Sequence, residues 1–163
     1  MDIIIPIAPH EYMDNRVLDG IQQLRIPHSL WIQESESKDV CPSKMDRIIN
    51  ARNQLRPKTT SDIVLCMDSD VVLNPILVHQ ALDQINKTPT VGMLGIPTDM
   101  DPGHVKIKCA LVRGVLLRTI PFRWDLLRCE CICFAKDIKY RGYQTQYLET
   151  DPICEVIDNE RHT

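Results

Sequence analysis

The sequence predicts a single α/β domain, residues 1–163, with a mostly parallel sheet flanked by helices. Strand-like and helix-like segments alternate through residues 1–96, which is typical of parallel strands joined by crossover helices. Residues 63–67 are apolar at every position, as expected for a strand that is buried on both faces. From residue 105 the pattern changes to alternation, which predicts mixed strands in the second half.

Local signals place the elements of the first half. Pro6 stops the first apolar run, and Ser43-Lys-Met-Asp46 resembles a capping box that opens a helix. Asn74-Pro75 supplies an N-cap and a proline in the first helical turn. In chain order, we expect a strand at 3–5, a helix at 14–24, a strand at 28–33, a helix from 43 to 57, the strand at 63–67, a helix from 75 and a strand at 91–96.

The second half carries weaker signals. Residues 105–111 alternate between apolar and polar, which predicts a half-exposed, antiparallel strand. Gly142 follows a helical pattern and marks its end. The expected elements are a polar loop at 99–103, the strand at 105–111, a short helix or turn at 114–120, a helix at 130–140 and an edge strand at 143–148.

Composition narrows the class of protein. The chain has 163 residues, of which 44% are hydrophobic and 25% charged, as in an ordinary globular domain. A net charge of -3 gives no basic field that favours nucleic acid. The apolar run at the N-terminus is too short for a signal peptide or a transmembrane segment, which predicts a cytoplasmic protein.

Seven cysteines are present, and Cys129-x-Cys131-x-Cys133 has the look of a metal cluster. An odd number without a secretory signal argues against a disulfide framework. The spacing also lacks the C-x2-C pairs of zinc sites. We therefore expect free thiols, several of them packed as small hydrophobic side chains.

Two aspartates, Asp68 and Asp70, directly follow the central apolar strand. The carboxyl end of a strand is where open α/β sheets place their ligands. Two nearby carboxylates are costly unless a cation compensates their charge, and a divalent metal held by phosphate oxygens does so. The plainer interpretation of this pair is a solvated acidic turn.

Further motifs occur in a recognisable order: an apolar strand ending in Pro6, Asn50-Ala-Arg-Asn53, Asp68-Ser-Asp70, Glu130, Arg141-Gly-Tyr143 and His162. This order resembles the GT-A fold of nucleotide-sugar glycosyltransferases, close to family 2, over essentially the whole chain. The resemblance implies a nucleotide-binding half at 1–96 and an acceptor and catalytic half at 97–163.

The resemblance also implies roles for individual residues. Asp68, Asp70 and His162 would hold Mn2+ or Mg2+, and Glu130 would be the general base. The nucleotide-sugar donor would contact Pro6, Ile7, Ala8, Glu34, Arg52 and Asp68. Trp124 and Asp125 would contact the acceptor. Each of these residues also has a plainer interpretation, such as a loop residue, an exposed arginine, a helix N-terminal glutamate or a core tryptophan.

Three features depart from the family pattern. Glu130 is flanked by Cys129 and Cys131, where the family has a pair of acidic residues. The loop after the second strand reads Glu34-Ser-Glu-Ser37 instead of D-D-G-S. The chain is also short, which suggests either a minimal catalytic domain or one that needs a homo-oligomer or a partner protein for its acceptor.

The predicted reaction moves a sugar from a nucleotide-diphosphate sugar to an acceptor hydroxyl with a divalent metal. Inversion at the anomeric carbon is favoured because Glu130 supplies a base. A UDP-sugar is favoured, although GDP-sugars fit the same site. One alternative is a nucleotidyltransferase, which the absence of glycine in Pro6-Ile-Ala-Pro9 disfavours. The other is a non-catalytic domain that binds nucleotide sugars or a partner.

Overall fold

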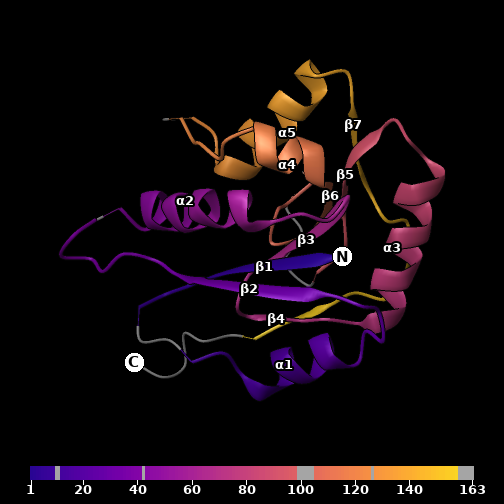
Figure 1. Ribbon diagram of the computed structural model, residues 1–163, viewed down its shortest axis with the longest axis horizontal. Helices are drawn as coiled ribbons and strands as arrows, with labels where there is room; N and C mark the ends of the chain where they lie inside the picture. The colour runs from indigo at the N-terminus through magenta and orange to yellow at the C-terminus, as the bar shows by residue number, and fades with distance from the viewer. Residues whose placement is uncertain (10–11, 42, 99–104, 126, 158–163) are drawn as a thin grey trace.

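A six-stranded sheet with the order β2-β1-β3-β6-β5-β7 organises the computed structural model (Figure 1). The structure describes residues 1–9, 12–41, 43–98, 105–125 and 127–157. All adjacent strands are parallel except β6, which is antiparallel to β3 and β5. The predicted class, mostly parallel with mixed strands in the second half, is confirmed. The strands are β1 (Asp2–Ile7), β2 (Ser29–Glu34), β3 (Ile63–Met67), β5 (Val91–Gly95), β6 (Cys109–Arg113) and β7 (Gln144–Tyr147).

Helices cover both faces of this sheet (Figure 1). They are α1 (Asn15–Gln22), α2 (Lys44–Leu55), α3 (Pro75–Lys87), α4 (Gly114–Thr119) and α5 (Glu130–Tyr140), and a 3-10 turn, η1 (Arg56–Lys58), follows α2. One core contains buried residues of α1 and α3, and the other contains those of α2, α4 and α5. The predicted caps are present, since Ser43 accepts from the Asp46 amide and Asn74 from the Ile76 amide. No helix in the described part of the chain is long and apolar enough to span a bilayer.

The prediction for residues 105–111 was wrong in its position and exposure. The strand begins at Cys109, is buried at its first four positions and lies between β3 and β5. The alternation came from Lys106 and Lys108, which lie in the segment before the strand. Its antiparallel direction was predicted correctly.

β1 was also longer than predicted, because it continues through Pro6 to Ile7. The pairing of β1 with β3 ends at Ile4, and only β2 accompanies the rest of the strand. Pro6 has no N–H to donate, and it is tolerated here because the pairing with β3 has already ended.

A second, two-stranded sheet was not predicted. β4 (Val71–Val72) pairs antiparallel with β8 (Glu155–Val156), and the Ile157 amide donates to the Asp70 carbonyl at 2.8 Å. Strands of two residues are too short to produce a periodic signal. This pairing brings the C-terminal segment beside the acidic turn.

Gly114 lies where β6 meets α4 and approaches the backbone closely. A Cβ at this position would lie 2.0 Å from the Ser61 carbonyl oxygen. We expect Gly114→Ala to lower the free energy of unfolding by about 1–3 kcal/mol, because the backbone must shift to remove the clash. Urea denaturation measures the change. Val115→Ala, at a half-exposed position of the same helix, is the control and should cost less; equal losses would contradict the argument.

Candidate active site

The acidic turn lies at the carboxyl end of β3, where Asp68 and Asp70 leave the sheet. The Asp68 amide donates to the Lys108 carbonyl at 2.9 Å, which ties the turn to the segment before β6. Lys108 Nζ in turn donates to Asp70 Oδ2 at 2.8 Å. The antiparallel pairing of β3 with β6 therefore places the Lys108 ammonium group beside Asp70.

Asp70 Oδ1 is buried and has no hydrogen-bond partner within the described residues. A buried carboxylate oxygen without a partner carries a large desolvation cost. Hard divalent cations take such oxygens as ligands. The donor set at Asp68 and Asp70 therefore fits Mn2+ or Mg2+.

Arg52, on α2, joins the acidic turn to α5. Its Nη2 donates to Asp68 Oδ1 at 2.5 Å and its Nη1 to Glu130 Oε1 at 2.7 Å. The residue is 2% exposed, and its guanidinium lies 5.8 Å from the centroid of the Phe122 ring. Burial opposes the charged form, but the two carboxylates outweigh it and raise the pKa of Arg52, so the guanidinium stays protonated.

The electrostatics of Asp68 show a local shortage of positive charge. Burial raises its pKa, and the charge of Asp70 adds to that rise. Arg52 and Lys108 act in the opposite direction, yet the pKa remains above its usual value. A bound cation would stabilise the ionised form of both aspartates.

Glu130 is the first residue of α5 and is 7% exposed. Its Oε1 accepts from Arg52, and no hydrogen bond to its Oε2 is present within the described residues. The carboxylate at a helix N-terminus is also favoured by the helix dipole. This arrangement holds the glutamate in one orientation with one oxygen available.

The cysteines beside Glu130 behave as packed thiols. Cys129, Glu130 and Cys131 each offer one possible ligand atom, a sulfur or a carboxylate oxygen. These three atoms lie within 4.8 Å of one another, as in a metal cluster. Burial, with the Glu130 charge, raises the pKa of Cys131 to about 12, which favours the neutral thiol at this buried position. All seven cysteines are free, and four others are buried, as predicted (Cys66, Cys109, Cys133 and Cys154).

The residues predicted to line the base pocket lie at the same sheet edge. Pro6 and Ile7 end β1, Ala8 follows, and Glu34 ends β2. These two strands are parallel to β3, so their carboxyl ends lie along the edge that carries Asp68. Ala8 and Glu34 are exposed. Their contact with a nucleotide remains a prediction.

The residues predicted to contact the acceptor have partners of their own. Trp124 is 39% exposed, and its indole N–H donates to Asp46 Oδ1 at 2.6 Å. Asp125 Oδ1 accepts from the Leu127 amide at 3.0 Å. Both residues lie in the segment that leads to Glu130, and their contact with an acceptor remains a prediction. His162 lies outside the described residues.

Sequence reasoning missed Lys108 and the central place of Arg52. Lys108 lies 38 residues from Asp70, and the distance between Arg52 and Glu130 is 78 residues. No local pattern reports such pairs. For Arg52, the resemblance implied contact with the nucleotide or its phosphates; that contact stays a prediction, and the structure adds the bridge between two carboxylates.

We expect Arg52→Gln to lower the free energy of unfolding by about 3–5 kcal/mol, because it leaves two carboxylates without their buried cation. Urea denaturation monitored by circular dichroism measures this. Arg16→Gln is the control, since Arg16 is half-exposed in its pair with Asp14 and should change stability by less than about 1 kcal/mol. Similar losses in the two variants would contradict a buried, bridging role.

Comparison with solved structures identifies the fold. The mannosyltransferase PcManGT of Pyrobaculum calidifontis, in complex with GDP-Man and Mn2+, matches with a TM-score of 0.76 at 18% identity, over 99% of this chain and 57% of that one. S. aureus TarS 1-349 matches with a TM-score of 0.69 at 15% identity, over 96% and 60%.

Glucosyl-3-phosphoglycerate synthase of Mycobacterium tuberculosis, in complex with Mn2+ and UDP-Glc, matches with a TM-score of 0.61 at 14% identity, over 93% of this chain and 71% of that one. No family model and no curated protein matches the sequence. The chain spans less than two thirds of the length of the first two structures. The architecture, with β6 antiparallel in an otherwise parallel sheet, is the GT-A fold.

Proposed function

We propose that this protein is a metal-dependent glycosyltransferase that moves a sugar from a nucleotide-diphosphate sugar to an acceptor hydroxyl with inversion. The observation that carries the proposal is the Arg52 bridge. It connects Asp68, in a turn whose oxygens suit a divalent cation, to Glu130, a buried glutamate with one free oxygen. These are the two groups that such a transfer needs, held by one side chain.

Asp68 and Asp70 would hold the metal, with the unpartnered Oδ1 of Asp70 as the first ligand. When bound, Mn2+ or Mg2+ neutralises the diphosphate that leaves the sugar. Lys108 already compensates part of the charge of Asp70 and lies close enough to attract the same phosphates. His162 is the proposed third ligand, as the family resemblance implies.

Glu130 would accept the proton of the acceptor hydroxyl through Oε2. In an inverting transfer the hydroxyl attacks the anomeric carbon from the side opposite the leaving phosphate, so the base and the metal must lie on different sides of the sugar. Arg52 fixes the carboxylate of Glu130 relative to Asp68. It acts as a positioning residue between the donor side and the acceptor side.

A UDP-sugar is the favoured donor. Pro6, Ile7, Ala8 and Glu34 lie along the sheet edge beside Asp68, in the place proposed for the base and ribose. Structures similar to this chain include complexes with UDP-Glc and UDP-GlcNAc and a complex with GDP-Man. These ligands support both uracil and guanine as the nucleotide base, and binding experiments with UDP and GDP distinguish the two. The proposed organisation is a donor half at 1–96 and an acceptor half at 97–163.

Isothermal titration of UDP and GDP, each with and without Mn2+, tests the proposal directly. Metal-dependent binding of one nucleotide, followed by metal-dependent hydrolysis of its sugar derivative, supports a transferase. Binding without hydrolysis would favour the non-catalytic alternative. Release of pyrophosphate from a nucleoside triphosphate and a sugar phosphate would favour a nucleotidyltransferase.

A further inference from the structure

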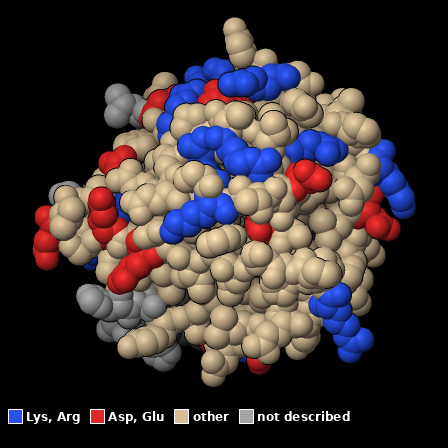
Figure 2. Space-filling view, viewed as in Figure 1, with Lys and Arg blue, Asp and Glu red and all other residues tan. Residues whose placement is uncertain are grey.

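The surface charge of the protein is unevenly distributed along the chain. Residues 105–147 contain nine Lys and Arg against three Asp and Glu, a net charge of +6, whereas the whole chain has a net charge of -3. Figure 2, which is viewed as in Figure 1, shows Lys and Arg gathered on the upper part of the face turned to the viewer, in the region of α2, α4 and α5. The acidic residues of 97–104 and 148–163 balance this charge over the proposed acceptor half as a whole, so within that half the segment 105–147 is the part that attracts anions.

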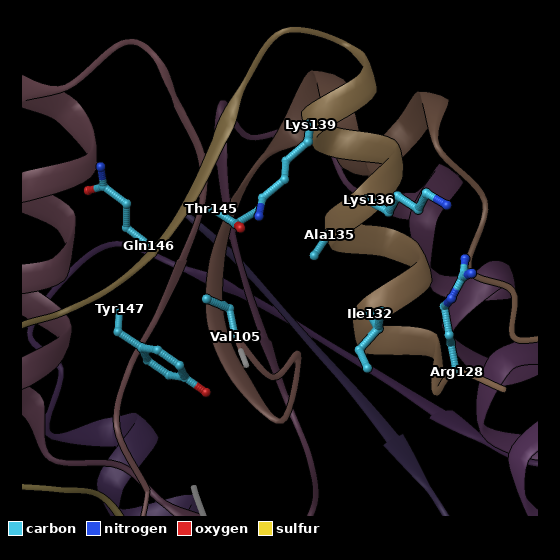
Figure 3. Close-up of a pocket in the computed structure, with 9 residues that line it drawn as sticks. All are labelled: Val105, Arg128, Ile132, Ala135, Lys136, Lys139, Thr145, Gln146 and Tyr147. Carbon is cyan, nitrogen blue, oxygen red and sulfur yellow. The ribbon is translucent and has the colours of Figure 1, made fainter. Parts of the chain in front are cut away.

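A pocket of about 580 Å³ lies between α5 and β7 in this half (Figure 3). Its volume falls in the range of small-molecule sites. Val105, Ile132 and Ala135 form an apolar wall, and Arg128, Lys136 and Lys139 supply the charge. Among the described residues, none of those that line it is acidic.

Two of these cations have no counter-charge. Arg128 pairs with Asp125 at 3.5 Å, but neither Lys136 nor Lys139 has an ion pair within the described residues. Both lysines are exposed. Figure 3 shows Lys139 reaching from α5 toward Thr145 on β7, while Lys136 and Arg128 carry their cationic ends to the other side of the helix.

The pocket shares a wall with the candidate active site. The Lys106 amide donates to the Tyr147 hydroxyl at 3.1 Å, and the Ile107 amide to Cys131 Sγ at 3.4 Å. Two residues after Lys106, Lys108 pairs with Asp70. The segment 105–108 therefore lies between the pocket and the acidic turn, and α5 carries Glu130 at one end and Lys139 near the other.

We propose that this pocket binds a phosphate group carried by the acceptor. The proposal rests on the proposed function and names its acceptor class. Lys139, which reaches toward Thr145, suits one oxygen of a dianionic phosphate, because Lys binds phosphate as a point charge, and Lys136 and Arg128 add positive charge to the lining. At about 1.5 Å per helical residue, Lys136 and Lys139 lie about 9–14 Å along the helix axis from Glu130. The phosphate is thus several bonds away from the hydroxyl that is glycosylated.

NMR titration of the 15N-labelled protein tests the assignment with three probes: glycerol 3-phosphate, inorganic phosphate and glycerol. We expect both phosphates to shift the amide signals of Thr145, Tyr147 and Ile132, and glycerol to shift none of them. Lys136→Gln/Lys139→Gln should weaken phosphate binding at least about tenfold. Lys87→Gln, which changes a lysine of α3, is the matched control and should bind as wild type.

UDP binding with Mn2+, measured on the same variants, separates the two proposals. If it survives in the double variant while phosphate binding is lost, the pocket is a distinct anion site beside a working donor site. Phosphate shifts that are equal in the double variant and the Lys87→Gln control, or that map elsewhere, overturn the assignment. A wild type that binds phosphate in the pocket but no nucleotide would refute the proposed function and leave only an anion pocket.

Discussion

Asp70→Asn is expected to abolish metal-dependent binding of the nucleotide. The substitution keeps the size of the side chain and an oxygen that accepts from Lys108, but it removes the negative charge and weakens the buried ligand atom. A metal that stabilises the diphosphate contributes several kcal/mol, so the affinity for UDP in Mn2+ should fall by about 100-fold or more. Isothermal titration measures it.

Asp83→Asn is the matched control, because it makes the same chemical change at an exposed position of α3. UDP affinity in Mn2+ should not change in this variant, and UDP affinity without metal should be the same in all three proteins. If Asp70→Asn binds UDP and Mn2+ as tightly as the control does, the acidic pair is a solvated turn, and the non-catalytic alternative becomes the better interpretation.

Glu130→Gln is expected to lower kcat by about 10²–10⁴-fold with little change in donor affinity. The glutamine can still accept from Arg52, so the bridge to Asp68 is kept in part, but the side chain cannot take the proton of the acceptor. Single-turnover transfer to an acceptor, with UDP titration in parallel, separates kcat from binding. Glu149→Gln, at an exposed position, controls for the change in charge.

The stereochemistry of the product gives an independent check on the same residue. An inverted anomeric centre with a strong loss in Glu130→Gln supports the base role. A retained centre, or full activity in the variant, would move the general base elsewhere and leave Glu130 as a structural partner of Arg52.

Local patterns in the sequence determined most of the elements. The fully apolar run at 63–67 predicted β3, and the caps at Ser43 and Asn74 predicted the starts of α2 and α3. These signals depend on residues within a few positions of each other, so propensity and hydrogen bonding to the local backbone suffice to set them. The position of Asp68 and Asp70 at the end of a buried strand followed from the same patterns.

Only the tertiary structure decided which side chains meet. β6 lies in the middle of the sheet because its buried faces pack against both layers of helices, although the lysines before it suggested a half-exposed strand. The Arg52 bridge and the Lys108 pair join residues 16 to 78 positions apart. Such contacts depend on strand order and register, which no single segment encodes. The sequence by itself therefore determined the fold class and the acidic turn, and the packing of α2, β6 and α5 around that turn decided the site.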